Sequence, residues 1–111
     1  MFSSDRKVST TNFNSLVVSF FQLANARMSD TQKTVLKLSH HLLKFNDLTV
    51  TALADMVSRR SNVPYSTAKW NLRSLKEMGL LTGGNTHCKG EYAKLTREAR
   101  MLADYFDREL A

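Results

Sequence analysis

The segment PYSTAKWNLRSLKEMGLL, residues 64–81, has the pattern of one helix with a defined start and a defined end. Pro64 suits the first helical position, because the amide hydrogen that it lacks would have no partner inside the helix. Gly79 readily adopts the left-handed backbone conformation that ends a helix. The segment therefore predicts a helix over 64–78, followed by an extended stretch that begins at residue 80.

This predicted helix has two distinct faces at about 100° per residue. The inner face consists of Ala68, Leu72, Leu75 and Gly79. The outward face consists of Ser66, Trp70, Arg73 and Glu77, with Lys69 beside it. Because the hydroxyl and basic groups come before Glu77, the first two turns suit an anionic partner better than the last turn does.

The preceding part of the chain predicts three more helices. The first covers 12–28, and residues 1–10 are predicted to form a flexible tail. Ser29 caps the second helix, which ends near Asn46 and buries a stripe consisting of Val35, Leu38, Leu42 and Phe45. A short edge strand over 48–50 leads into a third helix that ends near Arg59 and is capped by Thr49 or Thr51.

The part of the chain after Gly79 predicts a β-hairpin and a last helix. Residues 80–82 and 91–95 form the two arms, and the hairpin tip covers about 83–90. Thr96 caps a helix over 97–110. The fold class is therefore mainly α with a small β-hairpin, in a single domain over 11–111 whose core covers about 30–96.

The distribution of charge indicates an anionic partner. The chain has 111 residues, of which 16 are Lys or Arg and 10 are Asp or Glu, so its formal net charge is +6. Residues 31–96 carry ten basic and four acidic groups and account for +6, whereas 1–30 carry +1 and 97–111 carry −1. A positive field concentrated in this way attracts phosphate polymers or anionic lipid head groups.

Cysteine content and hydropathy indicate the cellular compartment in which the protein is expected. Its single Cys, Cys88, cannot form an intramolecular disulfide, which favours a reducing, cytoplasmic setting. A signal peptide is the alternative, because Arg6 and Lys7 precede the apolar stretch 16–24. Ser19 and Gln22 interrupt that stretch, and the spacing of its apolar residues favours an amphipathic helix. No membrane association is expected.

The order of the predicted elements resembles that of the winged helix-turn-helix domains in the broad MarR- and ArsR-like group of bacterial and archaeal transcription regulators. The residues that carry the resemblance are Leu53-Ala54, Thr67, Leu72, Leu75, Gly79-Leu80-Leu81 and Leu95-Thr96. Pro64 departs from the pattern, because that group often has a Ser or Thr cap there. The resemblance implies that helix 64–78 enters the major groove of DNA and that the hairpin touches the backbone or the minor groove.

The resemblance and the charge pattern together give a set of candidate DNA-binding residues. They are Arg59, Arg60, Ser66, Thr67, Lys69, Trp70, Arg73 and Lys89. Most have a plain structural alternative: Ser66 and Thr67 can serve the helix end, Arg59 and Arg60 suit a helix C-terminus, and Trp70 can fill a gap against the hairpin. A basic ridge of Lys33, Lys37, His40 and Lys44 is expected to face away from the core, more often solvated than bound to phosphate.

The first and last helices are each apolar on one side and need a partner. A homodimer is expected, with an interface formed by Phe13, Leu16, Phe20, Leu102, Tyr105 and Phe106. Such a dimer resembles those that MarR-type proteins form through their terminal helices. The alternative is that both helices only close the core of one chain.

No catalytic motif and no cofactor motif is present in the sequence, so an enzyme is not expected. His40 and His41 project about 100° apart on a helix, and His87-Cys88 supplies at most half of a metal site. The sequence thus predicts sequence-specific binding of double-stranded DNA by a transcription regulator, with any small-molecule effector unknown. The alternative function is a winged-helix adaptor that binds proteins in a replication or transcription complex.

Overall fold

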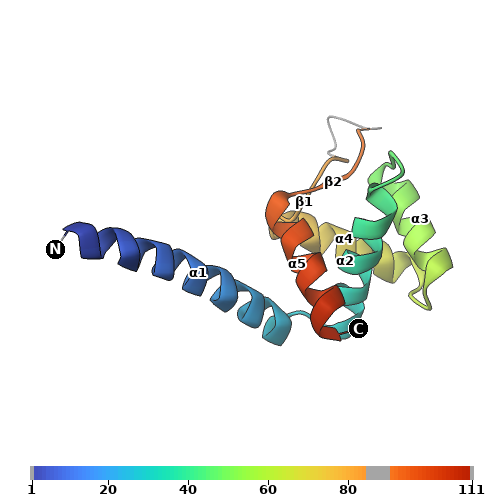
Figure 1. The fold of residues 1–111 in the computed structure, drawn as a ribbon. Coiled ribbons are helices and arrows are strands. Elements are labelled where there is room, and N and C mark those ends of the chain that lie inside the picture. The colour runs from blue at the N-terminus through green and yellow to red at the C-terminus, as the bar shows by residue number, and fades with distance from the viewer. Residues whose placement is uncertain (1, 85–90, 111) are drawn as a thin grey trace.

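The computed structural model describes residues 2–84 and 91–110, with side chains described for 14–84 and 91–108 (Figure 1). Within these residues the chain is mainly helical, with one small antiparallel hairpin. The elements follow the order α1 (Phe2–Arg27), α2 (Asp30–Leu43), α3 (Val50–Arg60), α4 (Tyr65–Glu77), β1 (Leu81–Thr82), β2 (Lys94–Leu95) and α5 (Arg97–Leu110). This confirms the predicted class, mainly α with a small β-hairpin.

Side-chain caps begin three of the helices, as the sequence predicts for all three. The Gln32 N–H donates to Ser29 Oγ over 3.1 Å at the start of α2. The Ala52 N–H donates to Thr49 Oγ1 at the start of α3, and the Ala99 N–H donates to Thr96 Oγ1 at the start of α5, each over 3.2 Å. These bonds satisfy backbone donors that have no partner inside their own helix.

The hairpin pairs Leu81 with Leu95 and Thr82 with Lys94. The predicted edge strand over 48–50 is reduced to a single bridge between Thr49 and Tyr92, beside which the Ala93 N–H donates to the Leu48 carbonyl over 2.7 Å. The predicted strand does not extend beyond this bridge because Val50 already belongs to α3. The bridge still ties the chain before α3 to the second arm of the hairpin.

The core lies between α2, α3, α4 and α5. Its fully buried apolar side chains come from all four helices and include Val35, Leu36, Leu53, Val57, Leu72, Leu75, Leu102 and Phe106. Figure 1 shows these helices gathered around one centre, with β1 and β2 at one end of α5. Burial of this apolar surface is the main term that stabilises the arrangement.

Helix α1 begins at Phe2 rather than near Asn12, so residues 2–10 belong to a helix and not to a separate tail. No Gly or Pro occurs in this segment to end the helix. Figure 1 shows α1 as a long arm that extends away from the other helices. Its last turns contact the core, where the ring of Phe21 stacks on that of Tyr105 with 4.8 Å between centroids.

Several predictions about the surface of α2 are wrong. Phe45 is 85% exposed instead of buried, because α2 ends at Leu43 and the chain turns away from the core. Lys33 and His40 are buried, so the expected basic ridge does not exist as a continuous exposed face. The cause is the position of α2, which packs against α3, α4 and α5, with Phe106 and Asp104 of α5 beside Lys33 and His40.

Among the described residues, no helix combines the length and the apolar character needed to cross a bilayer. This includes α1, which is long but has many polar side chains.

Candidate nucleic-acid interface

The roll of α4 about its own axis is fixed by its inner face. Ala68, Leu72 and Leu75 are fully buried, as the helical period predicts. Asn71 is also buried, and its Nδ2 donates to the Thr67 carbonyl over 2.8 Å within the same helix. Because these four residues face the core, the opposite side of α4 is presented to solvent.

The outward side of α4 carries the residues that the sequence places there. Ser66, Lys69, Trp70, Arg73 and Glu77 are all exposed. Trp70 has 65% of its surface exposed, so it does not fill a gap against the hairpin. An indole held this far out of the core is available to a ligand.

These side chains line a groove of about 760 Å³ that runs along α4. Val50, at the start of α3, and Gly84, after β1, contribute to its walls, and the other lining residues are Tyr65, Ser66, Lys69, Trp70, Leu72, Arg73, Lys76 and Glu77. Its charged residues are three cations, Lys69, Arg73 and Lys76, and one carboxylate, Glu77. The groove is therefore positive, with an apolar part made by Val50, while Leu72 lies beneath it and is fully buried in the core.

Two glycines that follow β1 allow the backbone to approach its neighbours closely. Gly83 and Gly84 have φ angles of +101° and +68°, which L side chains rarely adopt. A Cβ at Gly84 would lie 2.6 Å from Val50 Cγ2, and one at Gly83 would lie 2.4 Å from the Tyr92 carbonyl oxygen. The approach of Gly84 to Val50, which forms this wall of the groove, therefore requires glycine. Gly83 is required by the close approach of the other hairpin arm at Tyr92.

Lys69 is oriented by an aromatic neighbour one turn earlier. Its Nζ lies 5.9 Å from the centroid of the Tyr65 ring, within the range of a cation–π contact. Tyr65 itself is 38% exposed at the first position of α4. This contact places an ammonium group and a phenol at the start of the groove.

Three other predicted DNA-binding residues, Arg59, Arg60 and Thr67, do not line this groove. Thr67 is half-buried on the flank of α4. Arg59 and Arg60 are exposed in the last turn of α3, where Arg59 Nε pairs with Asp55 Oδ2 over 3.1 Å. Lys89 lies outside the described residues. Arg60 is the last residue of α3 and directly precedes the turn that leads into α4. Within the described chain, Arg60 forms no ion pair.

Two lining residues of α4, Tyr65 and Lys76, were missed by the sequence reasoning. Tyr65 lies four residues before Lys69, and Lys76 lies three residues after Arg73, so helical spacing alone would have found both. Val50 and Gly84 also line the groove, but their part in it depends on tertiary packing.

The predicted dimer residues separate into two groups. Leu16 and Phe20 are exposed on α1, whereas Leu102 and Phe106 are fully buried in the core of one chain and unavailable to a partner. Tyr105 is half-buried against Phe21, and the side chain of Phe13 lies outside the described part. The burial arises because α5 packs along α2 and forms a wall of the core.

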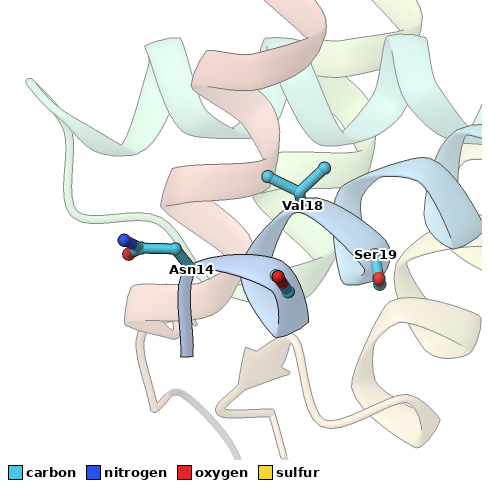
Figure 2. Close-up of a pocket in the computed structure, with 4 residues that line it drawn as sticks. Asn14, Val18 and Ser19 are labelled. Carbon is cyan, nitrogen blue, oxygen red and sulfur yellow. The ribbon is translucent and has the colours of Figure 1, made fainter. Parts of the chain in front are cut away.

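Other possible sites are less developed. The hollow in Figure 2 is lined by Asn14, Ser15, Val18 and Ser19, all from α1, so it is the surface of one helix rather than a cleft between elements. His40 and His41 are each 3.1 Å from a carboxylate of α5, belonging to Asp104 and Asp107. In the part of the chain that is described, no three His, Cys, Asp or Glu residues are grouped so as to hold a metal ion. His87 and Cys88 lie outside that part.

Comparison of the chain with protein-family models, with curated proteins and with solved structures gives no significant match.

Proposed function

We propose that this chain is a winged-helix protein that binds double-stranded DNA with the outer face of α4, as a transcription regulator does. The element order supports the winged-helix assignment, since α3, a short turn and α4 are followed by a hairpin. The bridge between Thr49 and Tyr92 adds a third segment beside the two strands. In this assignment α4 is the recognition helix and the hairpin is the wing.

The observation that carries the proposal is the exposed, positive outer face of α4. A helix with its side chains is about 10–12 Å wide, which matches the roughly 12 Å width of the major groove. Ser66, Lys69 and Arg73 precede Glu77 along this face, so the first turns can enter the groove while the carboxylate stays outside it. Arg73 is long enough to reach a guanine edge or a phosphate.

The test is a fluorescence-anisotropy titration of a 25-base-pair duplex by the full chain at 50 and 200 mM salt. The wild type is compared with a variant that combines Lys69→Ala and Arg73→Ala. A matched control combines Lys44→Ala and Arg108→Ala, which removes the same charge from exposed positions outside the groove.

The expected result is binding at 50 mM salt that weakens steeply at 200 mM, because released counterions make affinity depend on salt. The groove variant lowers affinity at least tenfold and makes the slope of log affinity against log salt shallower by about 1 to 2. The control variant lowers affinity less. Equal losses in the two variants would place the contact elsewhere, and no binding at 50 mM salt would leave the protein-binding adaptor as the better function.

A second copy of the chain is the partner that we propose for α1. Leu16, Phe20 and Leu23 are exposed on one side of this helix with spacings of four and three, which is the seam pattern of a coiled coil. Residues 8–26 contain no charged side chain, so this surface has nothing to attract a charged partner. A twofold axis places the same apolar patch on both sides of the interface, and the dimer then presents two copies of α4 to DNA.

A further inference from the structure

The groove contains more aromatic surface than contact with a paired duplex requires. Trp70 is 65% exposed and contributes nothing to the core, which is closed by the opposite side of α4. Val50 gives the groove an apolar part, and Lys69, Arg73 and Lys76 surround it with positive charge. An exposed π surface beside cations is the combination that proteins use to hold unpaired bases.

A paired duplex cannot make full use of this surface. In B-form DNA the faces of the bases are stacked on one another, and the major groove presents only their edges. An indole in that groove touches a thymine methyl or an edge, and its own face stays uncovered. A base that has lost its partner exposes a face on which an aromatic ring can stack.

Trp70 is better placed than Tyr65 to be this stacking surface. The ammonium of Lys69 already lies over the Tyr65 ring at 5.9 Å, so one face of that ring is covered. Among the residues that the structure describes, no cation lies over the ring of Trp70, which follows Lys69 directly in the chain. The contact between Lys69 and Tyr65 also holds a cation at the start of the groove, where it can meet the phosphate next to the stacked base.

We infer that Trp70 stacks on an unpaired base, so that the preferred ligand is a DNA duplex interrupted by an unpaired nucleotide rather than a fully paired duplex. This inference rests on the proposed function, because it assigns the ligand of the same groove. Lys69, Arg73 and Lys76 hold the phosphates on either side of the base. Val50 contacts the edge of the base that faces away from solvent.

The test uses the emission of Trp70, which is the only tryptophan in the chain. The full chain is titrated with a 25-base-pair duplex and with the same duplex carrying one bulged 2-aminopurine at its centre. Anisotropy gives the two affinities, and quenching of indole emission together with the 2-aminopurine signal reports stacking. Stacking of one base predicts about 5- to 150-fold tighter binding of the bulged duplex, with indole emission quenched only by that probe.

Two variants separate stacking from charge. Trp70→Leu is expected to bring the affinity ratio of bulged to paired duplex close to one, and Trp70→Phe to keep part of the preference, because it retains an aromatic face. Arg73→Ala is expected to weaken both probes by similar factors. Since Trp70 is exposed, both Trp70 variants are expected to keep the far-ultraviolet circular dichroism of the wild type.

The outcomes distinguish this inference from the function on which it rests. Equal affinity for the two probes, or a preference that survives in Trp70→Leu, overturns the stacking inference and leaves duplex binding by α4 in place. Absence of binding to both probes at 50 mM salt overturns the inference and the proposed function together.

Discussion

At the scale of single residues, one buried cation joins α1 to the rest of the molecule. The Nζ of Lys33 donates to Asn25 Oδ1 over 2.6 Å and lies 5.4 Å from the centroid of the Phe106 ring. Asn25→Ala removes the oxygen that accepts this hydrogen bond, so the buried ammonium group of Lys33 loses its partner. We expect the free energy of unfolding to fall by about 1–3 kcal/mol, measured by urea denaturation.

Asn14→Ala is the control for this prediction, since Asn14 is an exposed asparagine of the same helix. Both substitutions exchange Asn for Ala in the same helix, so their comparison separates the hydrogen bond from the general effect of that exchange. We expect Asn14→Ala to stay within about 0.5 kcal/mol of the wild type. If the two variants have equal stability, the bond to Lys33 contributes nothing.

Lys33 and His40 also show where reasoning from sequence fails for individual residues. The sequence pattern of α2 predicts one apolar stripe, and this prediction places Lys33 and His40 on the polar side of the helix. Their burial depends on α5, which supplies Phe106 beside Lys33 and Asp104 beside His40. Asp104 is 64 residues from His40 in the chain, and no local pattern pairs them. The exposed face of α4 was predictable because that helix is covered on one side only.

At the scale of elements, local chemistry made the starts of α2, α3 and α5 predictable. Thr96 is the clearest case, because its Oγ1 accepts from the Ala99 N–H at 3.2 Å and its hydroxyl also donates to the Leu80 carbonyl at 3.3 Å. Thr96→Ala removes both bonds at the junction of β2 and α5. We expect a loss of about 0.5–2 kcal/mol in the free energy of unfolding.

Thr96→Ser tests the same bond with the hydroxyl retained. It should recover most of the stability that Thr96→Ala loses, as measured by the midpoint of urea denaturation at constant slope. If the serine variant is as unstable as the alanine variant, the lost term is packing of the threonine methyl and not the cap.

The length of the short strand and the start of α1 were less predictable than the capped helix starts. The strand expected over 48–50 forms one bridge, and α1 continues to Phe2 through a segment expected to be loose. Both features depend on long-range geometry. The length of the strand depends on where Tyr92 lies, and the extent of α1 depends on whether other elements pack against it. Side-chain propensities, which act over a few residues, do not contain that information.

At the scale of the whole molecule, the groove combines predictable and unpredictable parts. Ser66, Lys69, Trp70 and Arg73 follow from the period of one helix. The wall at Val50 and Gly84 exists because the hairpin folds back on the start of α3, and this contact joins residues 34 positions apart. The position of α1 is likewise a property of the assembled chain, whose longest dimension is 54 Å.

The arm formed by α1 leads to the prediction about assembly. One chain has a mass of 12.6 kDa, so sedimentation or light scattering of the wild type is expected to give twice that value. Combining Leu16→Glu with Leu23→Glu places like charges on both sides of the proposed seam and is expected to give a monomer. Neither side chain belongs to the buried core, so the circular dichroism per residue should remain close to that of the wild type.

Val18→Glu provides the matched control, because Val18 is 52% exposed on α1 but lies about 160–220° around the helix from the seam residues. This variant is expected to stay dimeric, since its charge points away from the partner helix. A dimer broken equally by Val18→Glu would show that α1 is buried on all sides by its partner. A wild type that is monomeric at 100 µM would remove the second copy as the occupant of this surface.

In a dimer the two copies of α4 are expected to protect two half-sites whose centres are about 10–10.5 base pairs, or a multiple of this spacing, apart.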